Sequence, residues 1–280
     1  MTDKKVPEIN IATKAMIEQL FDDAAAVYDL AGPSIYTTFG TRLVEHMPLA
    51  PGTRILDVAT GKGAALLPIA RQVGSEGHVT GIDLSGTILE EADRSVCAAG
   101  LTNIVLRKMD AEHLEFPDQT FDVVTCAFSL MLFDDIDAAL REMYRVCKPD
   151  GYVGVSIFDK TPSPFDPAWP ILFQQFFTRC EKGWLMPQAL AYAPHEVEAL
   201  LGKVGFHSVA SYSETNDIVF ETLEDWWSFQ FTVGTRFTIV AMDEETRAKF
   251  KDEYFGKLRP SLTPDGLHLP VAVVYAVAQR

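Results

Sequence analysis

Two glycines and three acids carry the chemistry that this sequence suggests. Gly61 and Gly63 follow an apolar run that contains a single acid, Asp57. Two glycines within three residues let the backbone turn sharply and let a ligand approach the main chain closely. Asp83 ends a second apolar run, and Asp110 follows a third. Because the ends of successive parallel strands surround one crevice, this pattern predicts a nucleotide-shaped site.

The positions of the acids indicate the kind of ligand. An acid at the end of a second strand, such as Asp83, is placed to accept hydrogen bonds from both hydroxyls of an adenosine ribose. A dinucleotide site requires the longer G-x-G-x-x-G pattern and a partner for the pyrophosphate, whereas residues 61–63 supply only G-x-G. Three carboxylates around one ligand suit a cation better than a pyrophosphate. We therefore expect a positively charged ligand.

Alternating strands and helices must hold these residues in place. Apolar runs bounded by turn residues predict strands at 54–59, 78–83, 104–108, 121–127, 152–158, 206–215 and 269–278. Helical spacing predicts helices at 11–28, 34–47, 63–73, 86–99, 136–146 and 194–204. We expect Pro68 to bend its helix or to start it late, and residues 148–151 to form a turn. The order predicts an α/β fold, a Rossmann-like doubly wound sheet of seven strands.

Two insertions interrupt this order. Residues 160–170 are rich in proline and predict an irregular loop, and residues 169–186 are aromatic with partly helical spacing, as in a lid. A second aromatic insertion covers residues 223–264. We expect an N-terminal helical segment, 1–50, that covers the site, and a domain, 51–280, with helical caps at about 160–193 and 217–266.

The motifs resemble those of class I S-adenosylmethionine (SAM)-dependent methyltransferases, particularly the ubiquinone and menaquinone biosynthesis or "type 11" branch. The matching segments are residues 57–63 (DVATGKG), 81–85 (GIDLS), 110–122 (DAEHLEFPDQTFD) and 140–151 (LREMYRVCKPDG). Residues 21–29 (FDDAAAVYD) resemble a segment whose tyrosine closes over SAM in these relatives. The resemblance implies SAM as cofactor, and a last strand that runs antiparallel between the fifth and sixth.

The resemblance also implies roles for individual residues. Asp57 would accept from the SAM ammonium, directly or through water, Asp83 would bind the ribose, and Asp110 would accept from the adenine amino group. The other cofactor residues that we expect are Tyr28, which closes over SAM, Gly61 and Gly63 beneath the methionyl part, Leu84 on the adenine, Ala111, whose N–H donates to the ring, Phe128 and Ser129, whose carbonyls face the SAM amino group, and Ala59 in the turn.

Alternatives stay open for several of these residues. Asp57 is also consistent with a buried acid that caps the turn, and Tyr28 with the anchor of a packed helix. Ala59 stands where many class I enzymes have glycine, although the quinone branch has alanine too. Lys62 stands where threonine is commoner, and its ammonium either reaches solvent or meets the SAM carboxylate. Ser129 also faces the acceptor.

The aromatic insertions suggest the acceptor. A dry aromatic pocket over the SAM methyl group suits a flat or greasy small molecule, although the same side chains also serve to pack the caps. We expect substrate contacts from residues of both insertions and of the helix between them: Trp169, Phe173, Phe177, His195, Trp227 and Phe231. Methyl transfer relies largely on positioning. No histidine stands in a local signature, and we name no catalytic base.

Charge and composition exclude several classes of partner. The formal net charge of −15 argues against nucleic acid and anionic membranes, since both require a basic face. No apolar run approaches the ~18 residues of a membrane span, and the polar start predicts no signal peptide. The four cysteines are scattered without metal-ligand spacing, so that we expect a cytoplasmic protein with reduced thiols and no metal site.

Three hypotheses of function follow. The first is a SAM-dependent methyltransferase that acts on carbon or oxygen of a hydrophobic small molecule, such as a quinone-like, terpenoid or other secondary metabolite. The second is a cyclase that keeps SAM bound without transferring its methyl group. The third is an interaction module on a degenerate fold, which the intact cofactor acids argue against. The apolar face of the helix at 11–28 would also suit a homo-oligomer.

Overall fold

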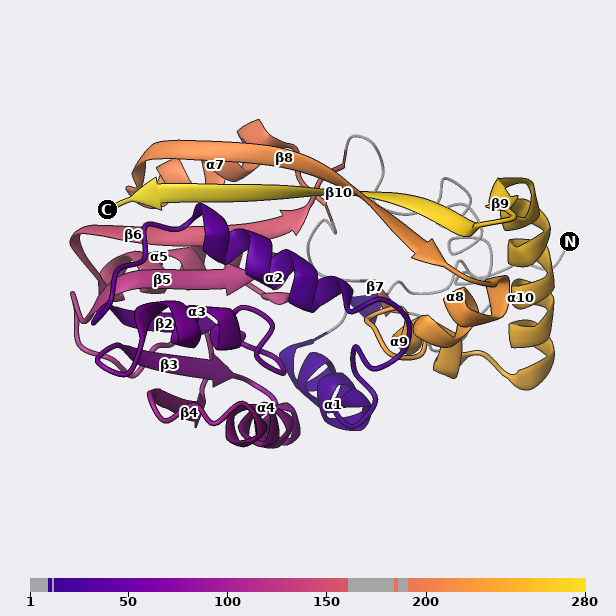
Figure 1. Cartoon of the computed structure of the whole chain (residues 1–280), viewed down its shortest axis with the longest axis horizontal. Coiled ribbons are helices and arrows are strands. Elements are labelled where there is room, and N and C mark those ends of the chain that lie inside the picture. Colours follow the sequence, from indigo (N-terminus) through magenta and orange to yellow (C-terminus); the bar gives the residue numbers. More distant parts are fainter. Residues whose placement is uncertain (1–9, 12, 161–183, 186–190) are drawn as a thin grey trace, which may run out of the picture.

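One mixed sheet organises the molecule, and the computed structural model describes residues 10–11, 13–160, 184–185 and 191–280 (Figure 1). Its main path runs β4-β3-β2-β5-β6-β10-β8. The strands are β2 (Arg54–Val58), β3 (His78–Asp83), β4 (Ile104–Lys108), β5 (Phe121–Ala127), β6 (Cys147–Phe158), β8 (His207–Phe220) and β10 (Gly266–Gln279). β10 pairs antiparallel with both β6 and β8. The doubly wound sheet and the inserted antiparallel last strand are therefore confirmed.

Short pairings accompany this sheet. The two-residue strand β9 (Leu262–Thr263) pairs with β10. A separate parallel pair joins β1 (Asn10–Ile11) to β7 (Trp184–Leu185). Chain order reverses between β2 and its two neighbours, β3 and β5. In open α/β sheets the crevice beyond the strand ends at such a reversal is where ligands bind.

Helices cover both faces of the sheet because its central strands are apolar on both sides. In β2, Leu56 and Val58 face a core completed by α5 (Ile136–Val146) and α7 (Pro194–Val204). Ile55 faces the opposite core, completed by α2 (Ile35–His46), α3 (Leu66–Val73) and α4 (Gly86–Ala98). Alternate residues of one strand therefore enter different cores, which explains the nearly continuous apolar run.

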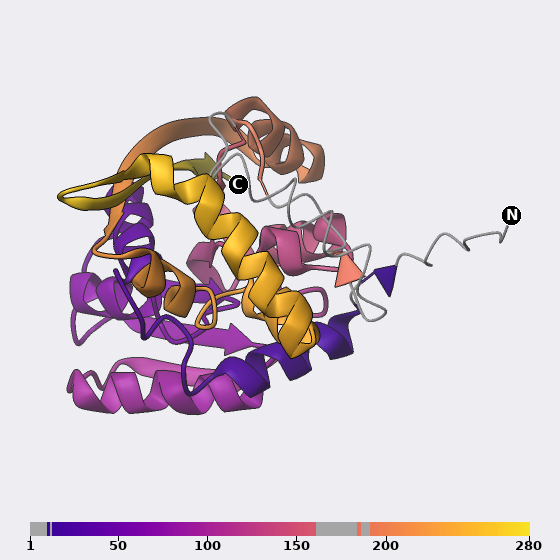
Figure 2. The same cartoon turned by 90° about the vertical axis from the view of Figure 1, so that its right-hand side faces the viewer.

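A third core lies beyond the carboxyl ends of the strands. There β8 and β10 extend past the other strands and carry α8 (Leu223–Phe229), α9 (Arg236–Ala241) and α10 (Glu244–Leu258) (Figure 1). Figure 2 shows α10 crossing this end of the sheet. We call its buried aromatic residues the cap core: Trp226, Trp227, Phe250, Tyr254 and Phe255. The start of α2 packs into the same cluster through Ile35 and Phe39.

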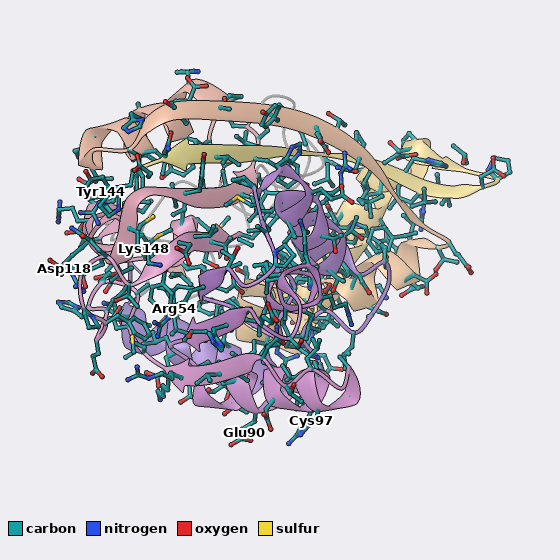
Figure 3. The ribbon with its side chains drawn as sticks, turned by 60° about the vertical axis from the view of Figure 1, so that its left-hand side comes forward. Arg54, Glu90, Cys97, Asp118, Tyr144 and Lys148 are labelled. Carbon is teal, nitrogen blue, oxygen red and sulfur yellow. The ribbon has the colours of Figure 1, made fainter. Side chains whose placement is uncertain are left out.

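The opposite end of the sheet is built differently. Figure 3 shows Arg54, Asp118, Tyr144 and Lys148 on the side away from the cap. Lys148 forms an ion pair with Asp122 at 2.6 Å, and that carboxylate also accepts from the Arg54 amide at 2.9 Å. Surface pairs of this kind contribute about 0–1 kcal/mol each. The ion pair and hydrogen bond at this end therefore join β2, β5 and β6 to one another.

Some boundaries differ from the expectation. Helix α3 begins at Leu66 rather than at residue 63, so that Pro68 lies in its first turn, where a missing N–H is tolerated. The turn expected at 148–151 is instead part of β6, whose pairing with β5 shifts register there and whose Asp150 has a φ of 62°. β8 runs on to Phe220 because it supports the cap.

The N-terminal helices match the expected bounds only in part. α1 (Lys14–Ala24) is shorter than the expected helix at 11–28, and α2 ends at His46, close to the expected end at 47. Of the helices in the described residues, none combines the length and apolarity that crossing a membrane requires.

Candidate functional site

A cavity of about 450 Å³ opens where β2, β3 and β5 end. Every predicted cofactor residue except Asp57 contributes to its lining: Tyr28, Ala59, Gly61, Gly63, Asp83, Leu84, Asp110, Ala111, Phe128 and Ser129. Helices α1 and α2 close the cavity from the other side with Lys14, Ile17, Tyr36 and Thr41. The cavity is thus formed between segments that are far apart in the sequence.

The turn after β2 leaves room for a ligand. Ala59, Gly61 and Gly63 all have positive φ, at 52°, 55° and 95°. A Cβ atom on Gly61 would meet no protein atom within 4 Å, so that it would point into open space. On Gly63 a Cβ would lie 3.3 Å from the Leu67 side chain. The backbone conformation therefore favours glycine at position 61, and the missing side chain leaves space that a bound group can occupy.

Main-chain amides hold the Asp83 carboxylate in a fixed position. Oδ2 accepts from the Gly61 amide at 2.9 Å, and Oδ1 accepts from the Ser85 amide at 3.0 Å. Burial raises the pKa of Asp83 despite these hydrogen bonds. Each carboxylate oxygen has a second lone pair. The side chain can therefore accept two further hydrogen bonds from a pair of hydroxyls.

Asp110 is held by a residue that the sequence did not reveal. Lys14 of α1 donates to Asp110 Oδ2 at 2.7 Å and to Glu112 Oε2 at 2.9 Å. Partial burial opposes ionisation of Asp110, but the hydrogen bonds from Lys14 and from the Glu112 amide outweigh it and lower the pKa of the carboxyl. Asp110 is therefore ionised at neutral pH and forms an ion pair with Lys14.

Two further residues of α1 fasten this helix to the cavity rim. Glu18 pairs with Lys108 at 2.5 Å. Asp22 accepts from the Ser85 hydroxyl at 2.5 Å, at the start of α4. Positions 14, 18 and 22 lie four residues apart and so share one helix face. That spacing was the signal available in the sequence, but the partners of these residues lie between 63 and 98 positions away and only the fold brings them together.

Asp57 does not line the cavity. Its side chain is only 1% exposed. Oδ2 accepts from the Thr60 hydroxyl at 2.5 Å, and Oδ1 accepts from the Thr125 hydroxyl at 2.6 Å. Burial raises the pKa of Asp57 to about 6. These contacts match the alternative of a buried acid that braces the turn from below, and a direct contact with a ligand in the cavity is not available to it.

A series of aromatic rings forms another part of the cavity lining. Phe21 contacts Tyr28 at 5.5 Å between ring centroids, Tyr28 stacks on Tyr36 at 5.6 Å, and Tyr36 meets Phe128 edge-on at 5.7 Å. We call these four residues the aromatic wall, and all four line the cavity. Phe128 then packs on Phe158 at 4.9 Å and joins the cluster that contains the cap core. The aromatic wall thus connects the cavity to the cap.

The expected substrate residues lie elsewhere. His195 is exposed at the start of α7 and does not line the cavity. Trp227 packs against Phe231, Phe250 and Phe255 inside the cap, and neither Trp227 nor Phe231 reaches the cavity lining. These two aromatics are used to build the cap. Trp169, Phe173 and Phe177 lie outside the described residues.

Comparison with known proteins decides the family. Residues 55–151 match a family model described as a methyltransferase domain. The chain is 34% identical over 181 residues to aklanonic acid methyltransferase DauC of Streptomyces sp. (strain C5), covering 63% of this chain and 82% of that one. It is 34% identical to demethylmenaquinone methyltransferase of Lactobacillus johnsonii, covering 62% of this chain and 69% of that one.

The chain is a class I SAM-dependent methyltransferase of the menaquinone-like branch. Solved structures agree on the fold. The YcgJ protein of Bacillus subtilis superposes with a TM-score of 0.60 at 18% identity, covering 87% of this chain and 98% of that one. The [4+2]-cyclase SpnF superposes with a TM-score of 0.62 at 19% identity, covering 96% of this chain and 98% of that one. At these identities the likeness concerns the fold alone.

The residues of the cavity fit the family's cofactor, SAM. Asp83 offers acceptors to a pair of hydroxyls, Gly61 leaves space at the turn, and acids outnumber bases around the cavity, as a cationic ligand requires. The methyltransferase therefore has a cavity lined by the aromatic wall and by an acidic side, made of Gly61, Asp83 and Asp110, that suits the nucleoside.

Proposed function

We propose that this methyltransferase transfers the methyl group of SAM to a hydrophobic small molecule, such as a quinone-like or terpenoid secondary metabolite. The observation that carries the proposal is the aromatic wall of Phe21, Tyr28, Tyr36 and Phe128, which continues from the cofactor cavity into the cap. Contact with such a wall removes water from a flat apolar acceptor and so favours its binding. The same wall offers few hydrogen-bond partners to a polar acceptor.

The names of relatives support this class of acceptor. One relative is named for aklanonic acid and another for demethylmenaquinone. A third, nocamycin O-methyltransferase of Saccharothrix syringae, is 31% identical over 65% of this chain and 64% of its own length. The net charge of −15 supports a small neutral molecule over nucleic acid.

We assign the cofactor contacts to the cavity residues. Asp83 would hold the ribose hydroxyls, Asp110 would accept from the adenine amino group, and Leu84 and Ala111 would pack along the base. When bound, SAM supplies a methyl group activated by its sulfonium. The protein's own task is then to hold the nucleoside, to exclude water with the aromatic wall, and to align the acceptor.

We assign no general base. Ser129, which lines the cavity beside Phe128, donates its hydroxyl to the Ala127 carbonyl at 2.9 Å, so that its proton is already engaged. Burial raises the pKa of Tyr36 to about 12 and that of Tyr28 well above its ordinary value, so that both phenols stay protonated at neutral pH. Such phenols suit orientation of an acceptor oxygen better than removal of its proton.

We propose that residues 1–50 act as a cover for the site, separate from the domain at 51–280. Support comes from the lining of the cavity, to which α1 and α2 contribute, and from the contacts of Lys14, Glu18 and Asp22 with the rim. A homo-oligomer through α1 is a separate proposal. Ile17, an apolar residue of this helix, is buried and lines the cavity, so that it offers no surface to a partner chain. Light scattering after size exclusion would test it.

The function is tested by turnover. The protein is incubated with SAM and a panel of acceptors that contains hydroquinones, aromatic polyketide acids and, as polar controls, ethanolamine and glycine. We expect S-adenosylhomocysteine together with an acceptor one methyl group heavier, from the apolar acceptors alone. Methylation of only the polar acceptors would overturn the acceptor class. A product isomeric with its precursor, without S-adenosylhomocysteine, would instead support the cyclase hypothesis, for which the likeness of fold to SpnF is the present support.

A further inference from the structure

Asp29 is an acid of the cavity to which neither the motifs nor the transfer assigns a role. It follows Tyr28 and lines the cavity. Its Oδ1 is buried and has no hydrogen-bond partner among the residues that the structure describes. An unpaired buried carboxylate oxygen is unfavourable unless a ligand supplies the donor. Asp29 therefore has an unfilled acceptor position at the cavity.

Lys62 places a positive charge next to this carboxylate. Its ammonium donates to the Tyr28 carbonyl at 3.1 Å, the carbonyl of the peptide that leads into Asp29. Two of its three donors remain for another partner. Burial raises the pKa of Asp29 to about 6, and the Lys62 charge and the Thr37 amide oppose that rise. An anion and a cation thus lie side by side at one place in the cavity lining.

The position of this pair follows from a chain of contacts along the strand ends. The Met109 amide, next to Asp110, donates to the Asp83 carbonyl at 2.9 Å. The Asp83 carboxylate accepts from Gly61, and Lys62 is the next residue. The adenine, the ribose and the arm attached to the ribose would therefore meet Asp110, Asp83 and the Lys62 region in that order. The arm of SAM ends in an ammonium and a carboxylate.

Asp57, the expected partner of that ammonium, is enclosed by two threonine hydroxyls below the turn. We propose that Asp29 binds the ammonium of the SAM amino acid arm and that Lys62 binds its carboxylate. The cap contributes to this arrangement, because the Asp29 amide donates to the Thr232 carbonyl at 2.8 Å and so holds Asp29 at its φ of 52°. The inference rests on the cofactor placement proposed above.

A structural role for Asp29 is the competing explanation. The Thr37 amide in the first turn of α2 hydrogen-bonds to the carboxylate, so that Asp29 could serve only to cap that helix. A capping role would affect the folding of α2 and would treat all nucleoside ligands alike. A binding role would affect only ligands that carry an ammonium. Ligands that lack one charge of the arm therefore distinguish the two explanations.

The experiment measures dissociation constants by calorimetry for four ligands: S-adenosylhomocysteine, its decarboxylated analogue, its deaminated analogue, and methylthioadenosine, which lacks the amino acid arm. For Asp29→Asn we expect about tenfold weaker binding of the two ligands that carry the ammonium. The other two should change less than about twofold. Lys62→Met should weaken the two ligands that carry the carboxylate by a similar factor.

Matched variants make each result decisive. Asp29→Ser keeps an oxygen that can accept from the Thr37 amide but removes the charge, so that it should behave like Asp29→Asn even if the asparagine variant folds poorly. Arg71→Gln tests another cation of the cavity lining, on α3, as the rival partner of the carboxylate. Lys148→Met, which changes a cation at the opposite end of the sheet, should leave all four ligands unaffected.

Three results would overturn the inference: equal weakening of all four ligands by both Asp29 variants, no weakening by either, or a loss of the carboxylate preference in Arg71→Gln instead of Lys62→Met. Asp83→Ala tests the underlying placement separately. If that variant still binds methylthioadenosine normally, the proposed cofactor site itself is wrong, whatever Asp29 does.

Discussion

The acidic side of the cavity and the cap core differ in what their side chains do: the first offers hydrogen-bonding groups to a ligand, and the second fills space. On the acidic side, Asp83 and Gly61 lie 22 positions apart and meet through one hydrogen bond, from the Gly61 amide to the Asp83 carboxylate. In the cap core, Trp227 and Phe255 pack edge to face with other aromatics and expose almost no surface. The acidic side consists of hydrogen-bonding groups around an open cavity, whereas the cap core is closely packed.

This difference teaches how ligand contacts and core packing are encoded separately. The acidic side must keep its donors and acceptors at fixed positions, so that a short local motif can encode it. The cap core must fill space, which many combinations of apolar side chains achieve. Changes in the cap core should therefore alter stability and leave the cofactor affinity intact, whereas changes on the acidic side should do the reverse.

The largest effect should come from the cap core. Phe250 is fully buried and stacks on Tyr254 at 5.8 Å. Phe250→Ala should lower the free energy of unfolding by about 3–5 kcal/mol, since it removes a buried ring and leaves a cavity. Urea denaturation measures this loss, with Lys249→Ala on the exposed side of the same helix as control. Weakened S-adenosylhomocysteine binding by the folded variant would break the separation between the two regions.

The acidic side should show the reverse behaviour. Asp83→Ala should weaken the binding of S-adenosylhomocysteine by about 100-fold, or roughly 3 kcal/mol, because two charge-assisted hydrogen bonds to the ribose are lost. Calorimetry measures the affinity. The matched control is Asp122→Ala, an acid at the opposite end of the sheet that pairs with Lys148. An equal loss of affinity in the control would mean that the effect is not specific to the cavity.

Asp29 should lower the stability of the protein while it strengthens the binding of SAM. Its pKa, about 6, lies above the ordinary value of 3.8, so that the folded protein resists its ionisation. Ionisation of Asp29 therefore lowers the free energy of unfolding. This loss is absent below about pH 4, grows as the pH rises to about 6, and is complete above that value. Asp29→Asn should therefore be more stable than the wild type by on the order of 1–2 kcal/mol at pH 7, and equally stable at pH 4. Denaturation at both pH values checks the sign.

Lys14 should show the opposite pH dependence and the smallest effect. The pKa of Asp110 is lowered, so that its pairing with Lys14 stabilises the protein at neutral pH and this contribution is lost as the pH falls through that lowered value. Lys14→Met should cost about 1 kcal/mol at pH 7, because the pair is partly exposed. The difference from the wild type should shrink towards pH 3. A constant difference would assign the loss to packing of α1 instead.

The sequence predicted the strands, the helices α5 and α7, and the lining of the acidic side, because each of these is encoded locally. Strand ends, a glycine turn and an acid after each strand stand close together in the chain. The contact of Lys14 with Asp110 spans 96 positions and involves an ordinary surface residue type, so that nothing local marks it.

The aromatic residues show a second limit. Trp227 and Phe231 have the composition of a substrate pocket, yet in the structure they fill the cap, whereas Tyr36, which was not singled out, lines the cavity. Composition tells that aromatic surface must be buried, but not against what. Similarly, two threonines enclose Asp57, the acid of β2, whereas Asp83, the acid at the end of β3, lines the cavity.

The position of β10 has a consequence for the order in which the chain is assembled during synthesis. Among the described residues, β8 pairs in the main sheet with β10 alone, and the residues of β10, 266–279, follow those of the cap helices in translation. The strands β2 to β6, which carry the acidic side, are complete by Phe158. A growing chain can therefore complete the lining of its cavity early, the aromatic wall included, while the cap waits for the final strand to join β6 to β8. A nascent protein would then have its cavity before the cap core is packed behind it.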